Sequence, residues 1–218
     1  MKAEDIRVLV ACEESQRVCT AFRERGFRAY SCDILPCSGG HPEWHHWGDV
    51  REVLYGDWDL VIAHPPCIYL TVSGNKYFNA DVYGEKAKIR QELRTEAVEF
   101  FMMFVTAPCE HIAIENPIGT MSTRYRKPDQ IYNPYDFAGE TECKKTCLWL
   151  KNLPKLIPNQ DLDPTLRTHN GYKAFFNGVQ YSWNDDRTSV LRSKTPKGVA
   201  EAMAEQWGNY LLDVEAKK

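Results

Sequence analysis

The sequence has no long hydrophobic run. Its longest apolar stretch, Phe100–Ala107, is well short of the ~20 residues that cross a bilayer, and the opening MKAEDIRVLV is charged before it becomes briefly apolar. The sequence therefore predicts no signal peptide and no membrane span. We expect a cytoplasmic protein with no membrane partner. In a reducing compartment the eight cysteines are expected to stay free thiols.

The sequence also lacks internal repeats, low-complexity segments and a linker rich in proline or glycine. A chain of 218 residues that is 43% hydrophobic is long enough to bury one core. We therefore predict one domain over residues 1–218.

A strong charge of either sign is absent as well. The formal net charge of −3 argues against a protein that coats nucleic acid by charge alone. Positions 118–197 nevertheless hold 13 Lys/Arg against 8 Asp/Glu, a net of +5 that leaves −8 on the remainder. This basic stretch fits either local contact with a polyanion or an ordinary mixed surface.

Short apolar segments alternate with amphipathic ones along the chain. The segments with strand character are Ile6–Val10, Phe27–Cys32, Asp59–Ala63, His111–Ile114 and Cys147–Leu150. Residues 33–47 have loop character, and Asp49 is placed to cap a short helix that runs to Leu54.

Helical spacing is seen in three places. One helix ends near Gly26, and a second, Glu85–Ala107, carries an apolar stripe. A third begins at Thr195-Pro196, with Thr as the cap. The stripe of the second helix is Ile89, Leu93, Ala97, Phe101 and Phe104, and the face of the third is Val199, Met203 and Trp207. The alternation predicts an α/β fold: a Rossmann-like, mostly parallel sheet with helices on both faces.

Two of the predicted strands end in reactive groups. The sequence DLVIA leads into His64-Pro65-Pro66-Cys67, and HIAI leads into Glu115-Asn116. Neighbouring parallel strands would bring the thiol and the carboxyl group to the same edge of the sheet. A thiolate there is a nucleophile, and the carboxyl group can hydrogen-bond a ring nitrogen and donate a proton.

These motifs resemble those of the DNA cytosine-5 methyltransferases. That family has a strand leading to a Pro-Cys, matched by Pro66-Cys67, and a later strand leading to a Glu-Asn, matched by Glu115-Asn116. Its cofactor-binding acidic residue and Gly-Asp pair are matched by Asp33 and Gly48-Asp49. Over nearly its whole length the chain is similar to short phage and prophage cytosine methyltransferase-like proteins, with which it shares IENP, RYRKPDQ, KKTCLWL and LP.

The resemblance implies a Rossmann-like methyltransferase fold and a reaction. Cys67 would add to C6 of a cytosine that has left the base stack, Glu115 would support N3, and C5 would take a methyl group from S-adenosylmethionine. Residues 1–117 would form the cofactor and nucleophile half, and residues 118–218 a basic, substrate-side half.

The site residues that the resemblance implies fall into three groups. The catalytic residues are Cys67, Glu115 and Asn116. The cofactor-binding residues are Ala11, Cys12, Glu13, Glu14, Asp33, Ile34, Asp49, Val50 and Pro65. The substrate-binding residues are Pro66, Tyr69, Ser73, Arg124 and Arg126.

The chain departs from the family pattern in four places. The loop after the first strand, Ala11–Ser15, is not rich in glycine, and Ile68 stands where Gln usually follows Pro-Cys. Arg124-Tyr125-Arg126 comes earlier than the family's Arg-x-Arg. No segment supplies a target-recognition domain, so the substrate is expected to be single-stranded DNA, duplex DNA read by a separate specificity partner, or a free pyrimidine nucleotide. A degenerate relative that binds DNA or cofactor without turnover is the non-enzymatic alternative.

Several residues have two readings. Either Glu13 or Glu14 binds the cofactor's ammonium group, or these residues begin a helix. Asp33 and Asp49 either bind the cofactor or cap loops. Arg124 and Arg126 either contact the substrate or form a solvated pair. His64 lowers the pKa of Cys67 or completes a turn. Asn75, Lys76 and Tyr77 form a lid or a solvated loop, and Trp183 and Trp207 are core or partner contacts. We predict no metal site, although Cys37, His41, His45 and His46, with Cys143 and Cys147, contain zinc-ligand types at unusual spacing.

Overall fold

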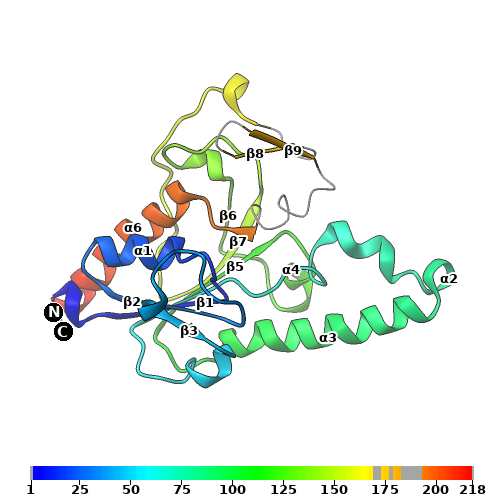
Figure 1. The fold of residues 1–218 in the computed structure, drawn as a ribbon, viewed down its shortest axis with the longest axis horizontal. Coiled ribbons are helices and arrows are strands. Elements are labelled where there is room, and N and C mark those ends of the chain that lie inside the picture. Colours follow the sequence, from blue (N-terminus) through cyan, green and yellow to red (C-terminus); the bar gives the residue numbers. More distant parts are fainter. Residues whose placement is uncertain (1, 169–172, 177–178, 183–192, 218) are drawn as a thin grey trace.

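The computed structural model describes residues 2–168, 173–176, 179–182 and 193–217. Its centre is a seven-stranded sheet in the order β3-β2-β1-β4-β5-β7-β6 (Figure 1). The strands are β1 Arg7–Ala11, β2 Arg28–Asp33, β3 His45–Trp47, β4 Leu60–Ala63, β5 His111–Pro117, β6 Gln130–Tyr132 and β7 Thr146–Lys151. Strands β1 to β5 pair in parallel, and β7 runs antiparallel to both β5 and β6. A separate hairpin contains β8 Lys173–Phe176 and β9 Val179–Ser182.

Helices cover both faces of the sheet, as predicted. Among the described residues the helices are α1 Arg17–Glu24, α2 Ala80–Tyr83, α3 Glu85–Val105, α4 Met121–Arg124 and α6 Lys197–Glu215. Helices α1 and α6 pack on one face, against Val8 and Val10 of β1, while α3 packs on the other face through Phe101 and Phe104. Successive β1 residues therefore supply two different cores, as the period of two in a strand requires.

Short 3-10 turns connect these elements. They are η1 Ala3–Asp5, η2 Pro42–Trp44, η3 Val50–Glu52, η4 Val72–Phe78, η5 Pro134–Asp136 and η6 Pro164–Leu166. Asp49 caps η3 by accepting the Arg51 N–H, in agreement with the sequence. No helix among the described residues is long and apolar enough to span a bilayer.

Several details differ from the sequence-based expectation, among them strands β6, β8 and β9, which were not predicted. The region read as loop between residues 33 and 47 contains the edge strand β3. Helix α6 begins at Lys197 with Pro196 as its N-cap, so Thr195 is not the cap. Ile89 is 50% exposed, because the first half of α3 projects beyond the sheet together with α2 and η4 (Figure 1). Trp207 is a core residue, and Trp183 lies outside the described residues.

Candidate active site

The segment that carries Cys67 is fixed at both ends. His64 follows β4, and its N–H donates to the carbonyl of Ala11 at 2.9 Å. The Cys67 carbonyl accepts from the N–H groups of Leu70 and Thr71 at 2.9 and 3.1 Å, so Cys67 opens a tight turn. The two intervening prolines fix φ. The half-buried thiol is thereby held at the carboxyl end of β4.

Glu115 lies beside this segment on the neighbouring strand. Ala63 of β4 pairs with Ile114 of β5, so the next residues, His64 and Glu115, are level with each other. The His64 Nδ1 and Glu115 Oε2 atoms are 3.0 Å apart, and the two side chains are 11% and 17% exposed. Asn116 donates from Nδ2 to the Pro65 carbonyl at 2.7 Å. The strand ends therefore place Glu115 and Asn116 beside the segment that carries Cys67.

The Cys67 thiol is in an electrostatically mixed setting. Burial raises its pKa, the Glu115 charge raises it further, and the Lys144 ammonium group acts in the opposite direction. Glu115 and Lys144 are therefore within range for their charges to act on the thiol. Lys144, just before β7, was not among the predicted site residues; its signal in the sequence was a Lys-Lys pair preceding an apolar strand.

The loop after β1 makes the turn that glycine usually makes, without a glycine. Cys12 has φ +60° and Gln16 has φ +56°, both in the left-handed region. The buried Glu13 carboxylate accepts the N–H groups of Val18 and Cys19 at 2.7 and 3.1 Å and so begins α1. Glu14 lies 3.7 Å from the Lys194 ammonium group. Of the two readings for Glu13, the helix start is the one its hydrogen bonds show.

The ends of β2 and β3 form an open edge beside this loop. Asp33 ends β2 and accepts the Leu35 N–H through Oδ1 at 2.9 Å. The next side chain, Ile34, is 73% exposed, and Trp47 is 69% exposed while its indole N–H donates to the Ile34 carbonyl. Asp49 is paired with Arg51 through both oxygens. Ala11, Val50 and Pro65 are buried and shape the edge rather than project from it.

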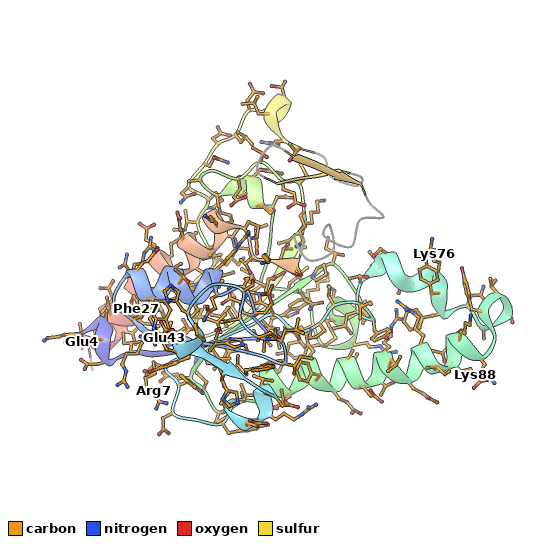
Figure 2. The ribbon with its side chains drawn as sticks, viewed as in Figure 1. Glu4, Arg7, Phe27, Glu43, Lys76 and Lys88 are labelled. Atoms are coloured by element: carbon orange, nitrogen blue, oxygen red, sulfur yellow. The ribbon has the colours of Figure 1, made fainter. Side chains whose placement is uncertain are left out.

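The segment after Cys67 is held by two arginines of α3. Arg90 donates to the Ile68 carbonyl at 3.1 Å, and Arg94 donates to the Tyr69 carbonyl at 2.9 Å and to Asn75 at 2.7 Å. The proposed lid of Asn75, Lys76 and Tyr77 is therefore part of η4 and is fastened to α3. Lys76 and Lys88 point away from the sheet on this projecting arm (Figure 2).

The remaining predicted substrate residues are less closely grouped. Pro66 and Ser73 are exposed, and Ser73 Oγ lies 3.0 Å from Thr71 Oγ1. Arg126 pairs with Asp129 at 2.7 Å and so has a structural partner. Arg124 is exposed, and burial together with its like charge lowers the pKa of Arg94. Arg124 therefore lies near the segment after Cys67, whereas Arg126 is tied to Asp129.

The histidines near β3 have separate partners. His41 contacts Glu43, His45 contacts Ser31 and the Leu35 carbonyl, and His46 contacts Glu52. Within the described ranges, no three His, Cys, Asp or Glu side chains converge as a metal site would require.

No family model matches this sequence, and comparison with curated proteins gives no related sequence. The fold and the site geometry are thus the observations that bear on function.

Proposed function

We propose that this chain is an S-adenosylmethionine-dependent methyltransferase that modifies C5 of cytosine in DNA through a covalent bond between Cys67 and C6. The observation that carries the proposal is the placement of Cys67 and Glu115 after the adjacent parallel strands β4 and β5, where the Glu115 charge acts on the thiol. Ligands of open parallel sheets bind at this edge, where the strand order reverses beside β1.

The cofactor assignment is supported by the chain's own groups around β1, β2 and β3. The left-handed Cys12 gives the first loop the turn expected of a glycine, Asp33 ends β2, and exposed Ile34 and Trp47 offer apolar surface for an adenine ring. S-adenosylmethionine, when bound, supplies an electrophilic methyl group. The sheet, with antiparallel β7 between β5 and β6, agrees with the methyltransferase fold to which the resemblance points.

The other steps of the reaction are assigned to side chains at the ends of β4 and β5 and near them. Cys67, as its thiolate, forms the bond to C6 and later leaves. Glu115 lies where it can hydrogen-bond the ring nitrogen that gains electron density, and Asn116 holds the Pro65 carbonyl so that the two strand ends stay in register. Arg124 and Lys144 give this edge positive charge for phosphate groups.

Transfer of a tritiated methyl group tests the proposal. Wild type is expected to label cytosine-containing single-stranded oligomers, with duplex DNA and dCMP as parallel substrates. Cys67→Ser is expected to abolish transfer and trapping on 5-fluorocytosine DNA. Cys37→Ser is the control, because Cys37 is a half-exposed thiol in the loop after β2. Labelling of dCMP alone would move the proposal to a free nucleotide, and full activity of Cys67→Ser would refute the covalent mechanism.

One observation favours a second candidate, a relative that binds DNA or cofactor without turnover. Burial raises the pKa of Cys67 above its ordinary value of 9.0, so the resting thiol is mostly protonated at neutral pH. Calorimetric binding of S-adenosylhomocysteine without transfer to any of the three substrates would establish this candidate.

A further inference from the structure

His64 lies beside the carboxyl group of Glu115 and within reach of the charge of the buried Glu13. Its Nδ1 contacts Glu115 Oε2 of β5 at 3.0 Å, and the carboxyl group of Glu13, from the loop after β1, lies close enough for its charge to act on the imidazole. Lys144, before β7, faces the same cluster, as does Cys67 on the segment that carries His64. Tyr132 of β6 and Cys147 of β7 also face Glu115, whose charge adds to burial in raising their pKa values.

The charges favour a protonated His64 beside an ionised Glu115. Burial opposes the imidazolium, but the hydrogen bond and charge of Glu115, followed by the charge of Glu13, raise the pKa of His64 above its ordinary value. Burial likewise opposes the Glu115 carboxylate, and His64 outweighs it, so the pKa of Glu115 is lowered. The pair therefore stores one proton on the imidazole.

The second ring nitrogen of His64 points to a purpose beyond packing. Nε2 is buried and has no hydrogen-bond partner among the residues that the structure describes. An unpaired buried polar atom destabilises the folded state, so an apolar residue would fill this space at less cost.

We propose that His64 is a positioning residue that keeps Glu115 ionised and in place, and that supplies through Glu115 the proton taken up by the pyrimidine ring. This inference rests on the proposed function and deepens it. His64 does not touch the base in this account, since Glu115 lies between them.

The proton and electrons balance across the addition step. The Cys67 thiolate, its proton already released to solvent, forms the S–C6 bond, and the electrons of C5=C6 move through C4 to N3. The His64 Nδ1 proton passes to the Glu115 carboxylate and from it to N3, so Glu115 is ionised before and after the step. Once C5 is methylated, its remaining proton passes to solvent water, its C–H electrons re-form C5=C6, and the S–C6 electrons return to sulfur as the thiolate leaves. The N3 proton returns to His64 along the same path.

NMR titration of the imidazoles in the free protein tests the pair without relying on activity. The His64 midpoint is expected to lie above 6.5, its ordinary value, and to fall in Glu115→Gln. A His64 midpoint that is unchanged in Glu115→Gln would overturn the inference.

The pH dependence of methyl transfer tests the proton step. The active form carries ionised Cys67 and protonated His64, so wild-type activity should rise with pH, level off and then decline. His64→Gln should lower kcat about 100-fold with little change in KM, and should remove the alkaline decline.

His111→Gln is the matched control. His111 is also buried, but it begins β5 and contacts the Asp59 carbonyl at 3.1 Å, at the far end of the strand from Glu115. His64→Gln with wild-type kcat and pH profile, or an equal loss in both variants, would overturn the proton step. Absence of methyl transfer by wild type would refute the proposed function. The NMR titration would still test, independently of activity, whether His64 and Glu115 form an ion pair.

Discussion

Cys12 occupies a backbone conformation that glycine adopts far more readily. A φ of +60° costs an ordinary residue roughly 1–2 kcal/mol. The turn therefore persists without the glycine that a comparison of motifs would demand, and the strain is located at the proposed cofactor edge, where such strain tends to concentrate.

Two substitutions at this position measure the strain. At most positions a protein with Gly is less stable than the same protein with Ala, because Gly loses more backbone entropy on folding. Here we expect the reverse: Cys12→Gly should be about 1 kcal/mol more stable than Cys12→Ala in urea unfolding. The same pair at Cys37 is the control, because its φ is not positive. Equal stability of the two Cys12 variants would contradict a strained turn.

The pair of His64 and Glu115 links stability to pH. Because the folded-state pKa of His64 is raised, its contribution is complete below 6.5 and is lost as the pH rises through the folded value. Because the pKa of Glu115 is lowered, its contribution is present above 4.5 and is lost as the pH falls through its folded value.

We expect the melting temperature of wild type to decline as the pH rises from 6.5, and this part of the decline to be absent in His64→Gln. Scanning calorimetry of both proteins between pH 5 and pH 9 gives the difference curve, from which titrations common to the two proteins cancel. Parallel curves above 6.5 would contradict the assignment.

At the scale of elements, the segments that follow β4 and β5 are bonded to each other. Thr120 N–H donates to the Leu70 carbonyl at 2.8 Å, and Val72 N–H donates to the Ile118 carbonyl at 3.3 Å. A Cβ atom on Gly119 would come within 2.0 Å of the Leu70 carbonyl oxygen, so this close approach requires glycine.

Gly119→Ala should therefore force these two segments apart. We expect a loss of about 1–3 kcal/mol in the free energy of unfolding, together with slower trapping on 5-fluorocytosine DNA. Gly56→Ala is a milder control, since its nearest new contact is 3.2 Å from the Trp58 side chain. Wild-type behaviour of Gly119→Ala in both measurements would disprove the coupling.

Helix α3 holds the segment after Cys67 through Arg94, whose guanidinium group also lies 3.3 Å from the centre of the Phe78 ring. Lysine cannot reproduce this two-sided contact. Arg94→Lys should lower kcat for methyl transfer about 100-fold, because a small misplacement of a nucleophile has effects of that size. The free energy of unfolding should change by less than about 1 kcal/mol.

Lys88→Ala, on an exposed part of the same helix, should leave both quantities unchanged, because the Lys88–Glu85 pair is a surface contact. If Arg94→Lys unfolds the protein, or if it retains full kcat, the arm has no positioning role.

At the scale of the whole molecule, α6 joins the last described part of the chain to its first strands. Trp207 is fully buried against the sheet, and its indole N–H donates to the Pro154 carbonyl at 2.9 Å. Gly208 lies under the ring of Phe27, where a Cβ would come within 2.7 Å of the ring. The C-terminal helix is therefore part of the main core.

Trp207→Phe should destabilise the whole molecule by about 1–3 kcal/mol, because it leaves the Pro154 carbonyl unpaired and reduces packing. Urea unfolding should remain a single transition with an unchanged slope. Glu205→Ala, at an exposed position of α6, is the control. A separate early transition in Trp207→Phe would show that α6 unfolds independently.

The local sequence pattern was sufficient to locate the central strands and to place Cys67 and Glu115 at one edge of the sheet. Both predictions depend only on short apolar runs that are visible in the sequence. It missed β3, because His45–Trp47 is short, polar and paired only along one side. It counted Ile89 in the apolar stripe of the second helix, because periodicity does not show where a helix extends beyond the sheet. The approach of Lys144 to the thiol depends on the antiparallel return of β7, which no local signal encodes. The chemical roles of these residues stay predictions.

Arg90 and Arg94 of α3 donate hydrogen bonds to main-chain carbonyl oxygens, which every amino acid possesses. The Ile68 side chain is 61% exposed and takes no part in these hydrogen bonds. We therefore expect replacement at position 68 to leave these backbone hydrogen bonds in place, so that the surface beside Cys67 changes without moving the sulfur.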